Sequence, residues 1–412
     1  MSEKLNRNVP KLRFPEFVVD WKKLTLISFV ENIIDYRGKA PPKSEDGIIL
    51  ITARNVKQGF LDFSSKEFIP SEDYDSWMSR GLPQKGDILF TTEAPLGNVC
   101  MFPDSGVYAL GQRTLTLRAK SGLSYGEFLF YILQSPKIRT EIFSKSTGST
   151  AKGIKSSVFK KIPLQVPSVE EQKKIANFLG AIDTRLTQLR RKRELLQTYK
   201  RGVMQKIFSQ EVRFKGAIGV AFPDWEETTL EKAAKYRRGS FPQPYGLEKW
   251  YDDNHGDPFV QVYDVDTNIQ LKLSTKRKIS REATPFSVFV KKGSIVLTIQ
   301  GSIGRIAITQ YDCYVDRTLL IFEKFLQPLN TLFFAHSIFL LFEIEKGKAP
   351  GGTIKTITKE SLSSFSLVIP CIEEQEKIAD FLTAIDQKIE AVARQVDRTE
   401  QFKKGLLQKM FV

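Results

Sequence analysis

Apolar residues recur every seven positions in two stretches of the chain, residues 167–208 and 370–411, with a second apolar series four positions after the first. This spacing is typical of a coiled-coil seam. Each stretch begins with a proline and has two glutamates in its first turn, where the helix dipole favours acidic side chains. We therefore predict two long helices. Their seam residues are Ile175, Leu179, Ile182, Leu186 and Leu189 in the first stretch, and Ile378, Leu382, Ile385, Ile389 and Val392 in the second.

The two stretches are copies of each other. At a constant offset of 203 residues, 18 of 42 aligned positions are identical. Self-similarity of this kind indicates a duplicated structural unit. A lone helix with one apolar stripe would expose it, so we expect the two helices to pack on each other. They would run antiparallel if a two-fold axis relates the repeats. The alternative is that each helix packs separately on its own globular domain.

A globular segment precedes each helix, and the predicted elements of the two segments follow the same order. For example, the strand-like GDILFTTEAPLGNVCM at residues 86–101 returns as GSIVLTIQGSIGRIAI at residues 293–308. The loops differ far more than the helices do. The predicted class is α+β, with two mixed α/β domains separated by two long antiparallel coiled-coil helices in a pseudo-two-fold repeat. The predicted segments are domain 1 at 1–166, helix 1 at 167–210, domain 2 at 211–369 and helix 2 at 370–412.

The charge of the chain suggests a polyanionic partner. The formal net charge is +15 and the pI is about 9.5, and so basic a chain usually meets nucleic acid; a generic basic protein is the alternative. Three cysteines without metal spacing fit a reducing compartment. The charged N-terminal segment lacks the apolar run of a signal peptide. The longest apolar run, residues 329–342, is too short to span a bilayer and is interpreted as a buried helix. We expect a cytoplasmic protein.

Motifs for catalysis or cofactor binding are missing from the sequence. The glycine pairs Gly106/Gly111 and Gly148/Gly153 have Walker A spacing but lack the Gly-Lys-Ser/Thr ending. No dinucleotide fingerprint follows a predicted strand. The two histidines, His255 and His336, have no zinc pattern. We therefore predict no catalytic residue, no metal and no cofactor in this chain.

Polar and basic residues gather in glycine-flanked loops at corresponding places of the two halves. Arginine suits the acceptors of guanine, whereas Asn and Gln suit adenine, and lysine suits phosphate. By their letters, Tyr36-Arg37-Gly38 matches Tyr236-Arg237-Arg238-Gly239, Gln112-Arg113-Thr114 matches Asp316-Arg317-Thr318, and Arg54-Asn55 corresponds to the different pair Tyr263-Asp264.

These loops give the predicted DNA contacts. For the matched loops, the alternative is that they hold a turn or a phosphate; for the differing loops, it is a plain solvated surface. The run Arg190–Arg193 either faces DNA between two half-sites, pairs with acidic residues of the other helix, or is solvated. The predicted contact residues are Arg37, Lys39, Arg54, Asn55, Gln112, Arg113, Thr114, Lys152, Lys155, Arg237, Arg238, Gln261, Tyr263, Gln300, Arg305, Arg317, Thr318, Lys348 and Lys355.

Over its whole length the chain closely resembles the specificity (S) subunits of Type I restriction-modification enzymes. The resemblance is carried by three motifs. They are E-E-Q-x-K-I-A-x-F-L-x-A-I-D at Glu170–Asp183 and Glu373–Asp386, K-x-G-x-x-Q-K-x-F from Lys200 and Lys403, and L-R-F-P-x-F at Leu12–Phe17.

The resemblance implies two target recognition domains, each reading one half of a split double-stranded DNA site, and a helical spacer that sets the gap. It also implies docking of two modification (methyltransferase) subunits and, in the nuclease complex, two restriction subunits. Those partners would bind S-adenosylmethionine, ATP and Mg. Our leading hypothesis is a non-catalytic DNA reader and assembly platform. The alternatives are a self-contained DNA-modifying enzyme and a two-headed DNA-binding regulator.

Overall fold

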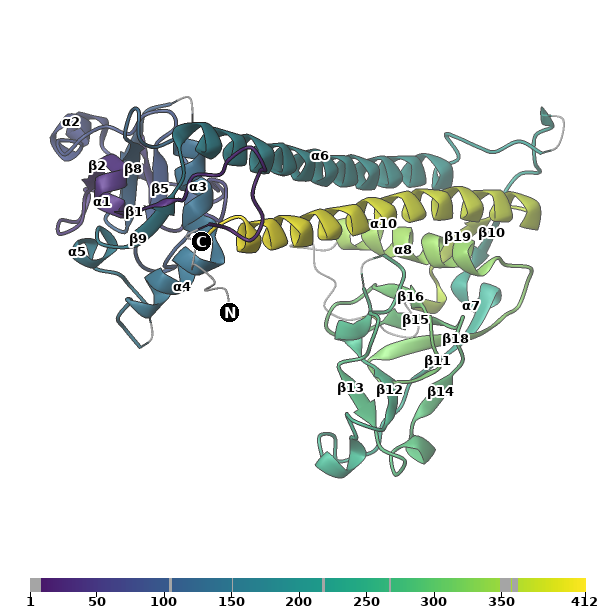
Figure 1. Ribbon diagram of the computed structural model, residues 1–412. Helices are drawn as coiled ribbons and strands as arrows, with labels where there is room; N and C mark the ends of the chain where they lie inside the picture. The colour runs from purple at the N-terminus through teal and green to yellow at the C-terminus, as the bar shows by residue number, and fades with distance from the viewer. Residues whose placement is uncertain are drawn as a thin grey trace. The chain divides into compact units, whose positions relative to one another are not determined.

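The computed structural model describes residues 9–103, 106–149, 151–216, 219–266, 268–348, 357 and 362–412. It contains two compact units (Figure 1). Unit 1 is Met1–Arg190 with Arg394–Val412, and unit 2 is Arg191–Ala393. These units differ from the four predicted segments, because each of them takes one end of each long helix.

The sheets of unit 1 are mostly antiparallel. The central strand β5 (Ile88–Thr91) is buried throughout, which explains its continuous run of apolar residues. Its sheet has the order β2 (Val30–Asp35), β8 (Thr114–Ala119), β5 and β6 (Val99–Met101). A second sheet has the order β4 (Glu67–Ile69), β3 (Ile48–Ile51) and β7 (Tyr108–Leu110), with β3 parallel to β7. A third pairs β1 (Lys22–Thr25) with β9 (Pro163–Val166).

The helices of unit 1, apart from the long ones, are short. Two of them follow each other along the chain, α3 (Gly126–Gln134) and α4 (Pro136–Ser144). The break falls at Ser135, where the proline that follows disfavours a helical conformation. The others are α1 (Leu26–Phe29), α2 (Tyr74–Trp77), α5 (Ser156–Phe159) and the 3-10 turn η1 (Ser71–Asp73).

Unit 2 repeats this plan with longer insertions. Its first sheet has the order β11 (Ala234–Arg238), β18 (Leu319–Phe325), β15 (Ile295–Thr298) and β16 (Ile306–Ile308). Its second has the order β13 (Arg277–Ile279), β12 (Asp257–Val260), β17 (Cys313–Val315) and β14 (Val288–Val290), with β12 parallel to β17. The third pairs β10 (Glu226–Thr229) with β19 (Ser366–Ile369). The remaining elements are α7 (Leu230–Ala233), α8 (Thr331–Lys348), η3 (Glu248–Trp250), η4 (Val262–Asp264) and η5 (Thr284–Phe286).

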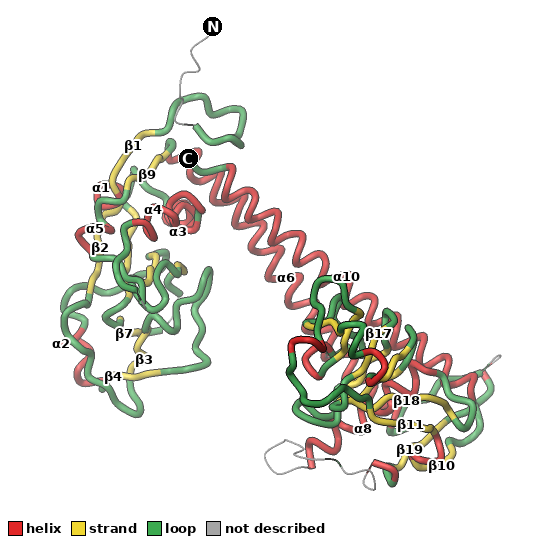
Figure 2. The backbone as a smooth tube through the Cα atoms, turned by 90° about the horizontal axis from the view of Figure 1, so that it is seen from below, coloured by secondary structure: helices red, strands yellow, loops and turns green. Residues whose placement is uncertain are grey.

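Both predicted long helices are present, as α6 (Val169–Phe208) and α10 (Ile372–Lys409). Within each unit their segments lie side by side (Figure 1, Figure 2). In unit 1, Lys403 Nζ lies 2.6 Å from Asp183 Oδ1, and Arg190 Nη2 lies 2.6 Å from Glu400 Oε1. The partner number falls as the α6 number rises, so the segments are antiparallel. All ten predicted seam residues are buried except Ile389, which is partly buried.

The beginning of each long helix is tied to its own unit by the same set of side chains. In unit 1, the amide of Gln172 accepts from the Tyr125 backbone N–H and donates to the carbonyl of Leu123. In unit 2, Gln375 accepts from the Asn330 N–H and donates to the carbonyl of Pro328. The helices therefore pack both on each other and on their domains, so the two packing alternatives coexist.

Candidate nucleic-acid interface

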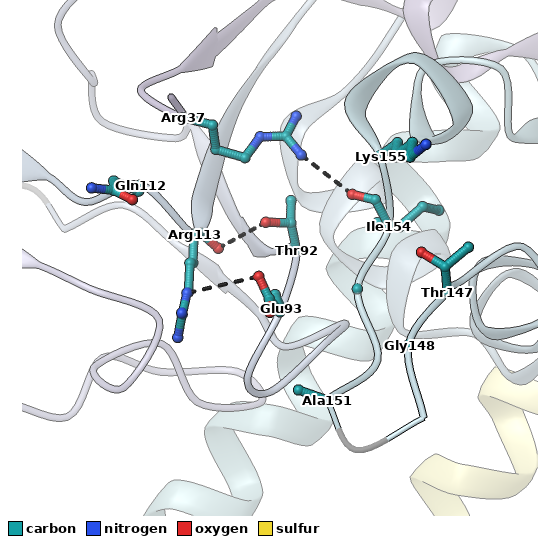
Figure 3. A pocket seen from close by; sticks show the side chains of 11 residues that line it. Arg37, Thr92, Glu93, Gln112, Arg113, Thr147, Gly148, Ala151, Ile154 and Lys155 are labelled. Carbon is teal, nitrogen blue, oxygen red and sulfur yellow. Dashed lines mark hydrogen bonds and ion pairs between the residues drawn. The ribbon is translucent and has the colours of Figure 1, made fainter. Parts of the chain in front are cut away.

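A polar pocket of about 510 Å³ lies on the surface of unit 1 (Figure 3). It brings together four of the predicted DNA contacts, which come from different parts of the sequence. These four are Arg37, Gln112, Arg113 and Lys155; the rest of the lining is Thr92, Glu93, Thr147, Gly148, Ala151, Gly153 and Ile154.

Backbone hydrogen bonds hold the walls of this pocket together. The N–H of Thr92 donates to the carbonyl of Arg113 at 2.9 Å, and the N–H of Ile154 donates to the carbonyl of Thr92 at 3.0 Å. Residues 147 and 153 exchange two backbone hydrogen bonds. Gly148 has φ +104°, and a Cβ there would lie 2.2 Å from the carbonyl oxygen of Ala151, so glycine is required. The small, glycine-rich loop therefore folds into a defined wall.

Arg37 is held by its neighbours. Its guanidinium donates to both carboxylate oxygens of Asp35, at 2.9 and 2.7 Å, and to the carbonyl of Ile154 at 3.3 Å. Burial alone would raise the pKa of Asp35, but the hydrogen bonds and charge of Arg37 lower it overall. Arg37 therefore supports the wall that contains Ile154.

The other predicted cations of unit 1 face solvent. Arg113 is exposed, with its Nε 3.8 Å from Glu93 Oε2 (Figure 3). Gln112 is half-buried beside it, and Lys155 is exposed. Lys39, Arg54 and Lys152 are also exposed but do not line the pocket.

Asn55 and its counterpart Asp264 hold a turn in the same way. Asn55 Oδ1 accepts from the Thr52 N–H at 2.9 Å, and Asp264 Oδ2 accepts from the Gln261 N–H at 2.9 Å. Both are buried, and the Asn55 amide also donates to the carbonyls of Asp62 and Ser65. The Asn55 side chain therefore holds the turn and does not face solvent, contrary to the prediction of a DNA contact. The neighbouring Arg54 and Tyr263, by contrast, are exposed.

The remaining predicted contacts divide between exposed and engaged side chains. Thr114 is buried, with its hydroxyl on the carbonyl of Gly111. Gln261 is also buried, and its amide donates to the Tyr245 hydroxyl. The exposed ones in unit 2 are Arg237, Arg238, Gln300 and Arg317, whereas Arg305 and Thr318 are half-buried. Lys355 and the side chain of Lys348 lie outside the described residues.

Strand pairing corrects the match between the two Arg-Thr motifs. In unit 1, Ile51 pairs with Leu110, and Thr91 pairs with Thr114. In unit 2, the equivalent pairs are Val260 with Val315, and Thr298 with Leu319. Gln112 therefore corresponds to Arg317, and Arg113 corresponds to Thr318. The match by letters was wrong by one residue, because the hydrogen-bond ladder sets the register.

The Tyr-Arg-Gly match is also wrong, by three residues. Leu117 of unit 1 corresponds to Phe322 of unit 2 in the register established above. Leu117 pairs with Ile33, and Phe322 pairs with Tyr236, so Ile33 corresponds to Tyr236. Arg237 and Arg238 consequently lie within strand β11, whereas Arg37 follows the end of β2. The correspondence of Arg54 with Tyr263, in contrast, is confirmed by the shared turn.

Sequence reasoning missed Glu93 and, in unit 2, Tyr245 and Lys276. Glu93 comes two residues after the end of the buried strand β5, and this position is the one signal that pointed to it. In unit 2, Arg317 lies 5.2 Å from the ring centre of Tyr245, and Lys276 lies 5.0 Å from that of Tyr263. An aromatic ring beside a cation also offers a face on which a base can stack.

Within the described ranges, no group of His, Cys, Asp and Glu side chains has an arrangement that could hold a metal ion. None of the helices described has the length and apolar character needed to cross a membrane.

The family model of the Type I restriction modification DNA specificity domain matches residues 19–197 and again residues 224–398. The chain belongs to this family. The resemblance inferred from the helix motifs is thereby confirmed, together with the two-fold repetition of a mixed α/β specificity domain.

Relatives of similar length carry the same description. The putative type I restriction enzyme MjaX specificity subunit of Methanocaldococcus jannaschii is 24% identical over 97% of this chain and 95% of its own length. The type I restriction enzyme EcoBI specificity subunit of Escherichia coli is 21% identical over 95% of this chain and 85% of its own length.

Solved structures share the fold. The S subunit of a Type I restriction-modification system from M. genitalium gives a TM-score of 0.56 at 18% identity, covering 98% of this chain and 99% of that one. A chain from a study of complex assembly and conformational transition of the type I R-M system gives 0.59 at 19% identity, covering 94% and 96%.

Proposed function

We propose that this specificity subunit reads a bipartite, asymmetric DNA site, with one specificity domain for each half-site. The observation that carries the proposal is a common backbone that carries different side chains in the two units. Arg54 corresponds to Tyr263, and Arg113 corresponds to Thr318, on the same turns and ladders. Because base edges are distinguished by donor and acceptor patterns, two such faces select different bases.

The contacts at the start of each long helix are, by contrast, repeated in both units. Glu171 accepts from Arg13 and from the Trp21 indole, and Glu374 accepts from Arg213 and from the Trp225 indole. Variation in the loops with constancy in the framework is what a duplicated reader requires. The net charge of +15 supports DNA as the ligand.

We further propose that the chain is non-catalytic and binds two copies of one partner, the modification (methyltransferase) subunit. Tyr199 and Phe402 occupy the same repeat position on α6 and α10 and are 54% and 56% exposed. A large aromatic side chain at an exposed helix position is a typical binding anchor. S-adenosylmethionine would then belong to the methyltransferase subunits, and ATP and Mg to two restriction subunits that join them. The setting would be the cytoplasm, where chromosomal DNA lies.

Exchange of one domain tests the two-reader proposal. Residues 1–166 are replaced by the corresponding segment of another family member, and the bound site is determined by selection from random duplex DNA. We expect one half-site to change while the other is retained. A change in both half-sites would contradict separate readers.

A second arm tests whether the helices set the gap between the half-sites. Removing four residues from each long helix shortens it by about 6 Å, and one base pair rises about 3.4 Å. The preferred gap should shift by about one to two base pairs. An unchanged gap would exclude a ruler role for the helices.

A further inference from the structure

Glu93 is the acidic side chain among the described residues that line the pocket of unit 1. Its carboxylate is 43% exposed and lies 3.8 Å from Arg113 Nε. An exposed ion pair of this kind contributes little to stability. A carboxylate on a surface that approaches DNA is also repelled by phosphates. Neither stability nor phosphate attraction therefore accounts for Glu93.

The backbone fixes Glu93 and Arg113 relative to each other. The residue before Glu93, Thr92, donates its N–H and its hydroxyl to the carbonyl of Arg113, at 2.9 and 3.2 Å. On its other side, Glu93 forms a β-bridge with Gly153. An acceptor and a donor thus stand side by side on a rigid support (Figure 3). Side chains held in this way are suited to discriminating between ligands.

This pair complements one particular base pair. In the major groove, C·G presents the N4 amino donor of cytosine next to the O6 and N7 acceptors of guanine. We propose that Glu93 accepts from the N4 amino group of a cytosine while Arg113 donates to its paired guanine. Unit 1 then specifies one C·G pair. The inference rests on the proposed function and names a base pair that the first domain reads.

The corresponding positions in unit 2 carry different chemistry. The hairpin that contains Glu93 has the same register as the one that contains Gln300, because Phe90 pairs with Val99 and Leu297 pairs with Ile306. Gln300 is exposed, and the hydroxyl of Thr318 donates to Asp316 at 2.5 Å. A carboxylate–guanidinium pair is therefore absent at these positions of unit 2. The C·G requirement belongs to one half-site.

The first experiment is a selection of bound duplexes from a random DNA library by the full-length chain. Against wild type, Glu93→Ala should reduce the preference for C·G at one position of one half-site, by roughly 5- to 150-fold. All other positions should be retained. Affinity for random duplex should be unchanged or higher, because a negative charge is removed; this readout separates lost reading from lost folding. Glu72→Ala, an exposed change of the same charge, should leave both half-sites unchanged.

The second experiment separates direct reading by Glu93 from mere positioning of Arg113. The cytosine at the affected position is replaced by an analogue that lacks the 4-amino group. Wild type should lose affinity for this duplex by a similar factor, whereas Glu93→Ala, which has no side-chain acceptor, should bind both duplexes equally. Substituting 7-deazaguanine in the opposite strand should weaken wild type but not Arg113→Ala.

The outcomes distinguish the two levels of the proposal. A wild-type chain that enriches no bipartite site overturns the proposed function and this inference together. A bipartite site that Glu93→Ala leaves unchanged overturns the inference alone. So does equal loss of affinity by wild type and Glu93→Ala on the analogue duplex.

Discussion

Tyr131 and His336 show how one residue position serves differently in the two units. Phe128 packs against Trp21 in unit 1, and Phe333 packs against Trp225 in unit 2, so Phe128 and Phe333 are equivalent. Tyr131 and His336 each lie three residues after these phenylalanines and are therefore equivalent too. The hydroxyl of Tyr131 donates to Asp183 Oδ2 at 2.8 Å. His336 is buried, and its Nδ1 has no hydrogen-bond partner among the described residues.

His336 should make unit 2 sensitive to mild acid. Burial, followed by the nearby charge of Lys200, lowers the pKa of His336 from 6.5 to about 3. Above pH 6.5 both the folded and the unfolded chain hold the imidazole neutral. Below it the unfolded chain takes up the proton first, so the folded state loses stability down to about pH 3. Between pH 7.5 and 5 the loss should be about 2 kcal/mol.

The variant His336→Phe should remove this part of the pH dependence, as measured by the free energy of unfolding in denaturant titrations at the two pH values. Tyr131→Phe in unit 1 is the matched control. Burial raises the pKa of Tyr131 further above its usual range, so this substitution should not alter the dependence. An unchanged acid sensitivity in His336→Phe would contradict the argument.

At the scale of elements, each long helix begins on a buried carboxylate. Glu171 of α6 is 1% exposed and accepts two hydrogen bonds from Arg13, each 2.8 Å long. Glu374 of α10 is 0% exposed and accepts two from Arg213, at 3.3 and 2.8 Å. This contact fastens the segment that leads into each domain to the first turn of a helix. The equivalent positions of Arg13 and Arg213 explain why the L-R-F segment at residues 12–14 is partly repeated as V-R-F at residues 212–214.

Removing the arginine should destabilise the unit, because a buried charge is left without its partner. We expect Arg13→Met to lower the free energy of unfolding by about 3 kcal/mol. The double variant Arg13→Met/Glu171→Gln should recover part of this, since the remaining buried group is neutral. Arg191→Met, on the exposed face of α6, should change stability by less than about 0.5 kcal/mol. Equal effects of the buried and exposed substitutions would refute a stabilising role for the contact between Arg13 and Glu171.

At the scale of the whole molecule, the repeat leads to an expectation about how many partners bind. The ion pair Lys403–Asp183 of unit 1 has its equivalent in Lys200–Asp386 of unit 2, at offset 203 in both members. The exposed aromatic residues Tyr199 and Phe402 directly precede these lysines. Because this surface occurs twice, we expect it to bind the same partner twice.

Partner stoichiometry tests this statement. We expect Tyr199→Ser to leave one methyltransferase subunit per chain, and Phe402→Ser likewise, whereas the double variant binds none. The measurement is the mass of the co-purified complex in solution. Loss of both copies by a single variant would indicate one shared binding surface. The exposed substitution Thr187→Ser serves as the control on the same helix.

Part of the interface could be anticipated from sequence. The turn that presents Arg54 and Tyr263 was placed correctly, because a short polar motif closes on itself. The register of Arg113 and Arg317 could not be predicted, because the similar sequence motifs that contain them are offset by one residue in the strand pairing. Of the run Arg190–Arg193, the first member pairs with Glu400 across the helices and Arg191 pairs with Glu194 on its own helix.

The sequence by itself determined the two long helices, their seam residues and the repeat, because heptad spacing and duplication are patterns in the order of the residues and do not depend on tertiary contacts. Only the tertiary structure decided which side chains share a surface. Glu93 and Arg113 meet because a backbone ladder joins segments 20 residues apart, and Asn55 is buried because the loop closes over it. Such contacts depend on strand register and loop closure, which are set by the folded chain as a whole.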